Sequence, residues 1–255
     1  MFEEKWNDIT VIIEYGMLSE EKFFEKADKF SLYPTTDSKY FTYDELIEEI
    51  KDNQTDKDGK TVILYSTNVK EQDSFIRIAE DKGYKVLLLD SPIISHLLQK
   101  LETTKEKISF ARVDSDTIEN LIKKEEENIS KLNEKEKETL NSYLEEIIPK
   151  EKFTIQLEAS DSNTPPFMIT LPEFMRRMKD MQATGGSSMF GNMPEIYNLV
   201  VNTNSELISN ILNTKTKSKR ERLINQSLDL AKLSQNLLKG QDLTNFIKRS
   251  FDLIK

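Results

Sequence analysis

The chain has 255 residues, enough for one large domain or two ordinary domains, each with a buried core. Its formal net charge of −9 argues against nucleic acid as the main partner, because neutralising phosphates requires a basic face. It has no cysteine and no apolar run near the ~18 residues that cross a bilayer, so we expect a cytoplasmic protein without disulfides, thiolate chemistry or membrane contact.

The first part of the chain is predicted to be a small helical layer. Apolar residues recur at helical spacing over residues 2–15 and again over residues 20–30. Thr42 and Glu45 have the spacing of a capping box, in which the glutamate accepts a hydrogen bond from the amide of the capping residue. This box should open a short helix that runs to about Lys51.

The pattern then changes to that of buried strands. Near-continuous apolar runs, rich in β-branched residues, occupy residues 61–66, 85–89 and 108–113. Predicted helices over residues 70–82 and 93–103 separate them. Alternating strands and helices with apolar strands are typical of a parallel sheet that is covered on both faces. We therefore predict a small α/β unit after the helical layer.

A charge-rich stretch over residues 123–133 is predicted to separate this unit from an α+β domain. In that second domain we expect a capped helix, three strands and three closing helices, at residues 134–148, 153–159, 166–170, 197–202, 205–213, 217–239 and 242–254. The predicted division is residues 1–126, with a helical layer (1–52) and an α/β unit (60–126), followed by residues 127–255.

Five of the eight methionines lie in the single segment 175–193. Methionine is unbranched and polarizable, so a cluster of it fits many apolar shapes. On a helical wheel over residues 174–182, Phe174, Met175, Met178 and Met181 fill one arc of roughly 120°. Charged residues fill the rest of the wheel. Either the stripe packs inward, as in an ordinary amphipathic helix, or it forms an adaptable surface for other proteins. The residues of that surface would be Phe174, Met175, Met178, Met181, Met189 and Phe190.

The last two predicted helices carry apolar stripes with little of their own domain left to cover them. Two such hairpins can pair across a twofold axis as a four-helix bundle, which buries both stripes. The alternative is a hairpin that folds back on its own sheet. We predict a homodimer whose interface includes Leu230, Leu237, Phe246, Ile247 and Ile254.

Patterns for catalysis are sparse in this sequence. His96 is the only histidine, no nucleophile-elbow pattern is present, and no glycine-rich phosphate loop follows a strand. Asp90 and Asp114 lie at or just past the carboxyl ends of predicted strands, the edge at which open α/β sheets bind ligands. The alternative function is therefore a metal-dependent α/β enzyme or regulator that uses these two aspartates.

With its elements placed, the chain resembles the bacterial members of the ninety-kilodalton heat-shock chaperone family. The order and spacing of the matching segments along nearly the whole chain carry the resemblance, rather than any one motif. These segments are Asp44–Glu45, Asn53–Gln54, KGYKVLLLD (82–90), RVDSD (112–116), EFMRRMKDM (173–181), YNLVVNTN (197–204) and LLKGQDLTNFIKRSFDLI (237–254).

The resemblance implies a C-terminal fragment, namely the end of the family's middle domain followed by its C-terminal dimerisation domain. The ATP-binding domain and the arginine that senses the γ-phosphate would lie upstream. We therefore expect a fragment with no cofactor and no enzymatic activity, although the full-length protein would be an ATPase that binds ATP and Mg²⁺.

The resemblance also implies a site for unfolded or partly folded client proteins. In the family, the amphipathic helix of the C-terminal domain contacts clients, which maps onto Phe174, Met175, Met178 and Met181. A middle-domain tryptophan contacts clients as well, and His96 occupies its position here. We thus predict the client-binding, homodimerising part of an ATP-dependent chaperone that acts in protein folding and the stress response.

Overall fold

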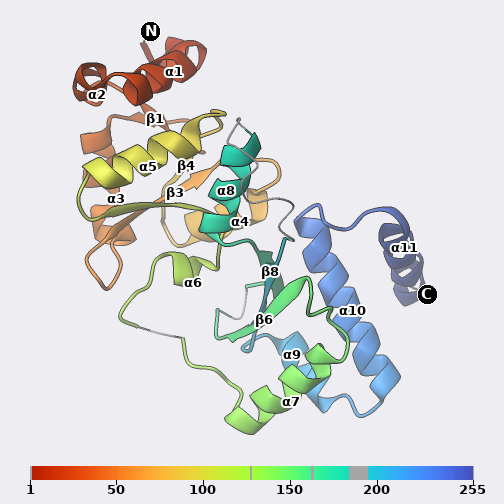
Figure 1. Ribbon diagram of the computed structural model, residues 1–255. Helices are drawn as coiled ribbons and strands as arrows, with labels where there is room; N and C mark the ends of the chain where they lie inside the picture. The colour runs from red at the N-terminus through yellow and green to blue at the C-terminus, as the bar shows by residue number, and fades with distance from the viewer. Residues whose placement is uncertain (1, 127, 162–163, 184–194, 255) are drawn as a thin grey trace. The chain divides into compact units, whose positions relative to one another are not determined.

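The computed structural model describes residues 2–126, 128–161, 164–183 and 195–254, and the chain in it divides into two compact units (Figure 1). The first unit contains the chain up to Glu125 and a later segment that begins at Pro172. The second contains Glu126–Leu171 and the described residues from Glu195 onward. No helix in the described ranges is long and apolar enough to cross a membrane.

The first unit begins with two helices, α1 (Phe2–Ser19) and α2 (Glu21–Ala27). A Cβ atom at Gly16 would lie 2.7 Å from the Phe23 ring, so glycine at this position allows the two helices to approach closely. A short antiparallel pair follows, β1 (Tyr33–Pro34) and β2 (Tyr40–Phe41), which the sequence pattern did not predict.

Helix α3 (Tyr43–Gln54) begins at the predicted capping box. The Glu45 carboxylate accepts a hydrogen bond from the Thr42 amide at 2.8 Å, which satisfies one of the free donors at the helix start. The helix continues three residues beyond the predicted end at Lys51. Its last residue, Gln54, is buried and donates to the Val62 carbonyl at 2.9 Å, so it ties the helix to the sheet.

The three strands of the first unit form a parallel sheet in the order β4-β3-β5. Their positions, and those of the two helices between them, lie close to the predicted ranges: β3 (Thr61–Ser66), α4 (Asp73–Asp81), β4 (Val86–Leu88), α5 (Ile94–Thr104) and β5 (Ile108–Arg112). A short helix that was not predicted, α6 (Ile118–Leu121), follows β5. Helix α4 ends at Asp81, and the turn that follows contains Gly83, whose φ of +75° suits glycine. The Tyr84 amide closes this turn on the Ala79 carbonyl.

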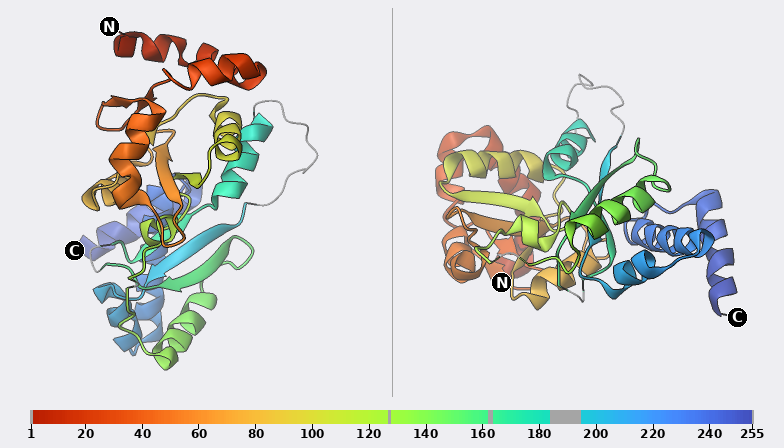
Figure 2. Two further views of the ribbon diagram at one scale, coloured as in Figure 1. Left: turned by 90° about the vertical axis from the view of Figure 1, so that its left-hand side faces the viewer. Right: turned by 90° about the horizontal axis from the view of Figure 1, so that it is seen from below.

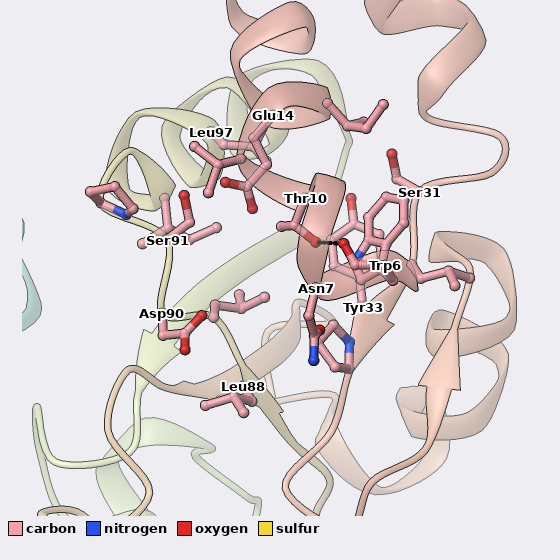
Figure 3. Close-up of a pocket in the computed structure, with 17 residues that line it drawn as sticks. Trp6, Asn7, Thr10, Glu14, Ser31, Tyr33, Leu88, Asp90, Ser91 and Leu97 are labelled. Atoms are coloured by element: carbon pink, nitrogen blue, oxygen red, sulfur yellow. Dashed lines mark hydrogen bonds between the residues drawn. The ribbon is translucent and has the colours of Figure 1, made fainter. Parts of the chain in front are cut away.

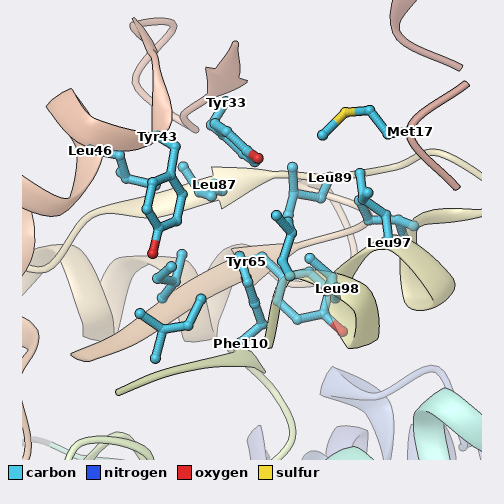
Figure 4. Close-up of a cluster of buried hydrophobic side chains, with 14 of the residues drawn as sticks. Met17, Tyr33, Tyr43, Leu46, Tyr65, Leu87, Leu89, Leu97, Leu98 and Phe110 are labelled. Carbon is cyan, nitrogen blue, oxygen red and sulfur yellow. The ribbon is translucent and has the colours of Figure 1, made fainter. Parts of the chain in front are cut away.

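One hydrophobic core joins the helical layer to this sheet (Figure 4). Strand β3 is buried along its whole length after Thr61, as expected for the central strand of a parallel sheet. The side chains labelled in the figure come from α1, α3, α5, the β1 segment and the three-stranded sheet with the residue after β4: Met17, Tyr33, Tyr43, Leu46, Tyr65, Leu87, Leu89, Leu97, Leu98 and Phe110.

The second unit is built around a mixed sheet in the order β6-β8-β7, in which β8 runs parallel to β6 and antiparallel to β7. Its elements are α7 (Glu134–Glu145), β6 (Phe153–Glu158), β7 (Phe167–Thr170), β8 (Tyr197–Asn202), α9 (Glu206–Asn213), α10 (Lys217–Ser234) and α11 (Gly240–Ile254). Helix α10 ends five residues before the predicted Lys239, because Asn236 adopts φ +55° and the Leu237 amide bonds back to the Lys232 carbonyl at 2.9 Å.

The end of β8 organises the loops of the second unit. Buried Asn202 donates to the Asp161 carbonyl at 2.9 Å and accepts from the amides of Ser160 and Asn204 at 3.2 and 3.0 Å. The Asn204 side chain in turn accepts from the Lys131 amide at 2.8 Å. Asn202 and Asn204 of the YNLVVNTN segment are therefore structural residues that hold loops.

Helix α8 (Glu173–Ala183) lies between β7 and β8 in the sequence, yet it belongs by its contacts to the first unit. The chain passes from the first unit to the second between Glu125 and Glu126, next to the predicted boundary at residue 126. The domain predicted over residues 127–255 therefore lacks α8, which groups with the first unit instead. The physical reason for this placement is the charged side of the helix.

Candidate functional site

Four polar residues form a stripe along α8. Glu173, Arg176, Arg177 and Asp180 are spaced i, i+3, i+4 and i+7, which places them on one side of a helix. Each of them bonds to, or lies beside, a residue of the α/β unit described above. The charged side of α8 therefore faces the protein.

Glu173 anchors the first turn of the helix to the sheet. Its carboxylate accepts from the Tyr65 hydroxyl at 2.7 Å and from the Arg112 amide at 3.0 Å. Arg177, one turn later, donates to the same carboxylate at 2.7 Å. Burial, and secondly the charge of Glu173, raise the pKa of Tyr65, so this phenol remains a hydrogen-bond donor.

Arg177 joins α8 to the end of α5 and to β5. Its guanidinium donates two hydrogen bonds to the Glu102 carboxylate, of 2.6 and 3.1 Å, and one to the Phe110 carbonyl, of 2.8 Å. Its side chain is only 15% exposed. Burial disfavours the charge, but the bond with Glu102 and the charge of Glu173 outweigh it and raise the pKa of Arg177. Bidentate arginine–carboxylate pairs of this kind are among the stronger polar contacts.

Asp114 lies between two guanidinium groups. Arg176 of α8 is 3.0 Å from its carboxylate, Arg112 donates to it at 2.9 Å, and the residue is 4% exposed. This pairing neutralises the charge that the alternative function would use for a metal. Asp90 is exposed, and the described residues contain no group of three potential metal ligands. The metal-dependent alternative is not favoured.

The apolar side of α8 points away from these contacts. Phe174 is 71% exposed, and Met175, Met178 and Met181 are partly exposed. Charged residues therefore form a packing face of α8, where an ordinary amphipathic helix packs its apolar stripe inward. Met189 and Phe190, the other two predicted client contacts on this segment, lie outside the described residues.

His96 lies on the neighbouring helix. Helices α5 and α8 lie side by side in the views of Figures 1 and 2, and the Ser95 hydroxyl is 3.5 Å from the Asp180 carboxylate. His96, the residue after Ser95, is partly exposed. The structure thus brings His96 beside the helix that carries Phe174, although 78 positions separate the two residues in the sequence.

The predicted dimer residues differ in their exposure within one chain. Leu230 of α10 and Ile247 of α11 are 52% and 45% exposed, whereas Phe246 is 8% exposed and is part of the interior. Leu237 is partly buried against the core of the second unit, and the side chain of Ile254 lies outside the described part of the chain.

Reasoning from the sequence missed the polar residues that orient α8. Tyr65, Glu102 and Arg112 lie 60 or more positions from the helix, so no local pattern connects them to it. A signal was present within α8 itself. The polar residues of α8 recur at the same helical spacing as its apolar residues. A polar stripe with that spacing can pack against polar partners elsewhere in the protein, just as an apolar stripe packs against a core.

Comparison with known proteins gives the family. The Hsp90 protein family model matches residues 1–254. This chain belongs to the Hsp90 family. Among curated Hsp90 relatives, it is 36% identical to the chaperone protein HtpG of Bacteroides thetaiotaomicron over 99% of this chain and 47% of the relative. It is 42% identical to HtpG of Porphyromonas gingivalis over 91% of this chain and 34% of the relative.

A Bacteroides fragilis HtpG, 35% identical, aligns over the same shares of the two Hsp90 chains as the B. thetaiotaomicron protein. The chain therefore spans about half the length of the first Hsp90 relatives that it matches. Two of the segments on which the resemblance rested are joined in the structure, because Asp114 of RVDSD pairs with Arg176 of EFMRRMKDM.

Proposed function

We propose that this chain is the client-binding and homodimerising part of an ATP-dependent Hsp90 chaperone. Membership of the family and similarity to proteins named HtpG support a role in chaperoning. The client surface in this proposal consists of Phe174, Met175, Met178 and Met181 of α8, with His96 of α5 beside it.

The inverted orientation of α8 carries the proposal. An exposed phenylalanine beside partly exposed methionines is costly to leave in water, since burying a side chain of this size contributes about 1.5–3 kcal/mol. The buried ion pairs of Arg176 and Arg177 hold this side outward. Methionine adapts to partners of different shape, and two copies in a dimer raise the effective concentration of weak contacts.

The test is suppression of aggregation of an unfolding protein by the chain. We expect the double variant Phe174→Ser, Met178→Ser to remain folded and dimeric but to lose most of the suppression. The matched control is Ile12→Ser, Ile129→Ser, which removes apolar side chains that are 72% and 87% exposed elsewhere. If both variants suppress aggregation equally well, α8 does not form the client surface.

Homodimerisation is proposed through the two last helices. Arg249 of α11 donates to Asp229 and Gln226 of α10, at 2.5 and 2.8 Å, so polar contacts hold the helices of one chain together. Large apolar side chains on both helices remain exposed, namely Leu230, Leu233, Ile247 and Phe251. A second copy that contributes the same residues would cover them in a bundle of four helices.

Nucleotide chemistry belongs, in this proposal, to the part of the full-length protein outside this chain. We expect no ATP hydrolysis and no saturable ATP binding by the 255 residues alone. Isothermal titration with Mg²⁺–ATP checks this, and saturable binding with a stoichiometry near one per chain would require a nucleotide site in the described units.

A further inference from the structure

A cavity of about 290 Å³ lies in the first unit, and all the residues that line it come from the segment 6–97. One wall is α1, another is the segment around β1, and the third is the segment from Leu88 to Leu97 (Figure 3). Much of the lining is apolar, including Ile13, Leu89 and Ile94. None of its residues belongs to the proposed client surface, so an inference about it stands independently of that proposal.

Three buried polar atoms at this cavity have no hydrogen-bond partner among the described residues. They are Trp6 Nε1, Glu14 Oε2 and the Tyr33 hydroxyl, on side chains that are 2%, 6% and 4% exposed. Leaving a buried donor or acceptor without a partner costs about 1–3 kcal/mol. Three of them around one cavity indicate a site whose partners come from a bound molecule.

The charges around the cavity have one sign. Glu14 and Asp90 both line it, and none of its lining residues is lysine, arginine or histidine. Figure 3 shows the Glu14 carboxylate turned toward Ser91, which hydrogen-bonds to it, with Asp90 on the adjoining segment. Burial, and to a lesser extent the charge of Asp90, raise the pKa of Glu14 to about 7. A positively charged group would offset both the burial and the repulsion.

The remaining polar atoms define the rest of the ligand. Trp6 Nε1 can only donate, so its partner must be an acceptor, while the Tyr33 hydroxyl can donate or accept. Apolar walls require an apolar body between the cation and the acceptor. At about 30 Å³ for each water-sized group, the cavity holds about ten non-hydrogen atoms.

We propose that this cavity binds a small organic ammonium ion whose apolar body carries a hydroxyl or carbonyl acceptor. The ammonium group pairs with Glu14 and faces Asp90, and the acceptor receives the Trp6 Nε1 hydrogen. Tyramine, with ten non-hydrogen atoms, is a suitable probe. Tyrosol is its matched neutral control, because a hydroxyl replaces the ammonium group and the rest is unchanged.

The single tryptophan makes the test direct, since the indole N–H of Trp6 gives the only such signal in a ¹⁵N-correlated NMR spectrum of the chain. We expect tyramine to shift this signal saturably, with a dissociation constant in the millimolar range or below, and tyrosol to bind at least tenfold more weakly. No saturable shift with tyramine, or equal affinity for tyrosol, overturns the proposal.

Substitution of the Glu14 carboxylate separates recognition of the ammonium charge from non-specific apolar binding in the cavity. Glu14→Gln keeps the shape of the side chain and should weaken tyramine at least tenfold while it leaves tyrosol unchanged. Glu25→Gln, an equivalent change at an exposed position of α2, is the control and should leave both unchanged. An unaltered tyramine affinity in the folded Glu14→Gln variant would remove Glu14 from the site and overturn the proposal.

Discussion

The orientation of α8 predicts an unusual order of stability effects for substitutions on its two sides. Replacing Arg177 by methionine removes two bonds to Glu102, one to Glu173 and one to the Phe110 carbonyl. Hydrogen bonds to charged groups contribute about 1.5–3 kcal/mol each, and removing one partner of a buried pair costs about 3–5 kcal/mol. Because Glu102 and Glu173 stay 24% and 22% exposed, water offsets part of the loss, and we expect about 2–3 kcal/mol.

On the opposite side, Met178→Ala should cost less than about 1 kcal/mol, since this side chain is partly exposed and leaves no buried cavity. An ordinary amphipathic helix gives the reverse order. Urea unfolding followed by Trp6 fluorescence measures both, because the only tryptophan is buried in the first unit. A double-mutant cycle with Glu102→Gln isolates the pair. If Met178→Ala proves more destabilising than Arg177→Met, the orientation described here is wrong.

Three further predictions concern other parts of the chain. Glu14 has a pKa of about 7 when folded against an ordinary 4.5. Its contribution to stability is fully present below 4.5 and is lost as the pH rises to 7, so Glu14→Gln should gain stability over the parent between about pH 4 and pH 8, by up to about 3 kcal/mol in urea titrations. A constant difference across that range would contradict the burial of an ionisable Glu14. Ile247→Glu with Phe251→Glu should halve the mass found by light scattering without unfolding the chain, since both side chains are exposed in one protomer, and a persistent dimer would place the interface elsewhere. Calorimetric titration with Mg²⁺ should give no saturable heat, because Arg112 and Arg176 already pair with Asp114; binding that Asp114→Asn abolishes would restore the metal-dependent alternative.

Elements with a strong local period were predictable from the sequence. The strands Thr61–Ser66 and Tyr197–Asn202 have the bounds that the apolar runs indicated. The capping box at Thr42, and the one at Asn133 just before the predicted helix 134–148, open their helices. The hairpin of β1 and β2 was missed because strands of two residues have no measurable period. The end of α10 was misplaced because Asn, which resembles any polar surface residue in sequence, adopts the left-handed conformation at position 236.

The candidate site was predictable only in part. A helical wheel separates the apolar and charged sides of α8 but cannot say which side packs inward, because that depends on partners such as Glu102 and Tyr65, which are distant in sequence. The cavity in the first unit was likewise predictable only in part. Glu14 shares a helical face with Trp6 and Met17, so a carboxylate within an apolar stripe was visible, whereas its contact with Ser91 required the fold.

The central claim is that the apolar side of α8 contacts client proteins, and methyl NMR of the methionines tests it most directly. The chain has eight methionines, and Met17 and Met168, at 1% and 7% exposure, serve as internal references. On titration with an unfolded client, we predict that the methyl signals of Met175, Met178 and Met181 shift while the two reference signals stay in place. Client binding that leaves the three α8 signals unchanged would contradict the claim.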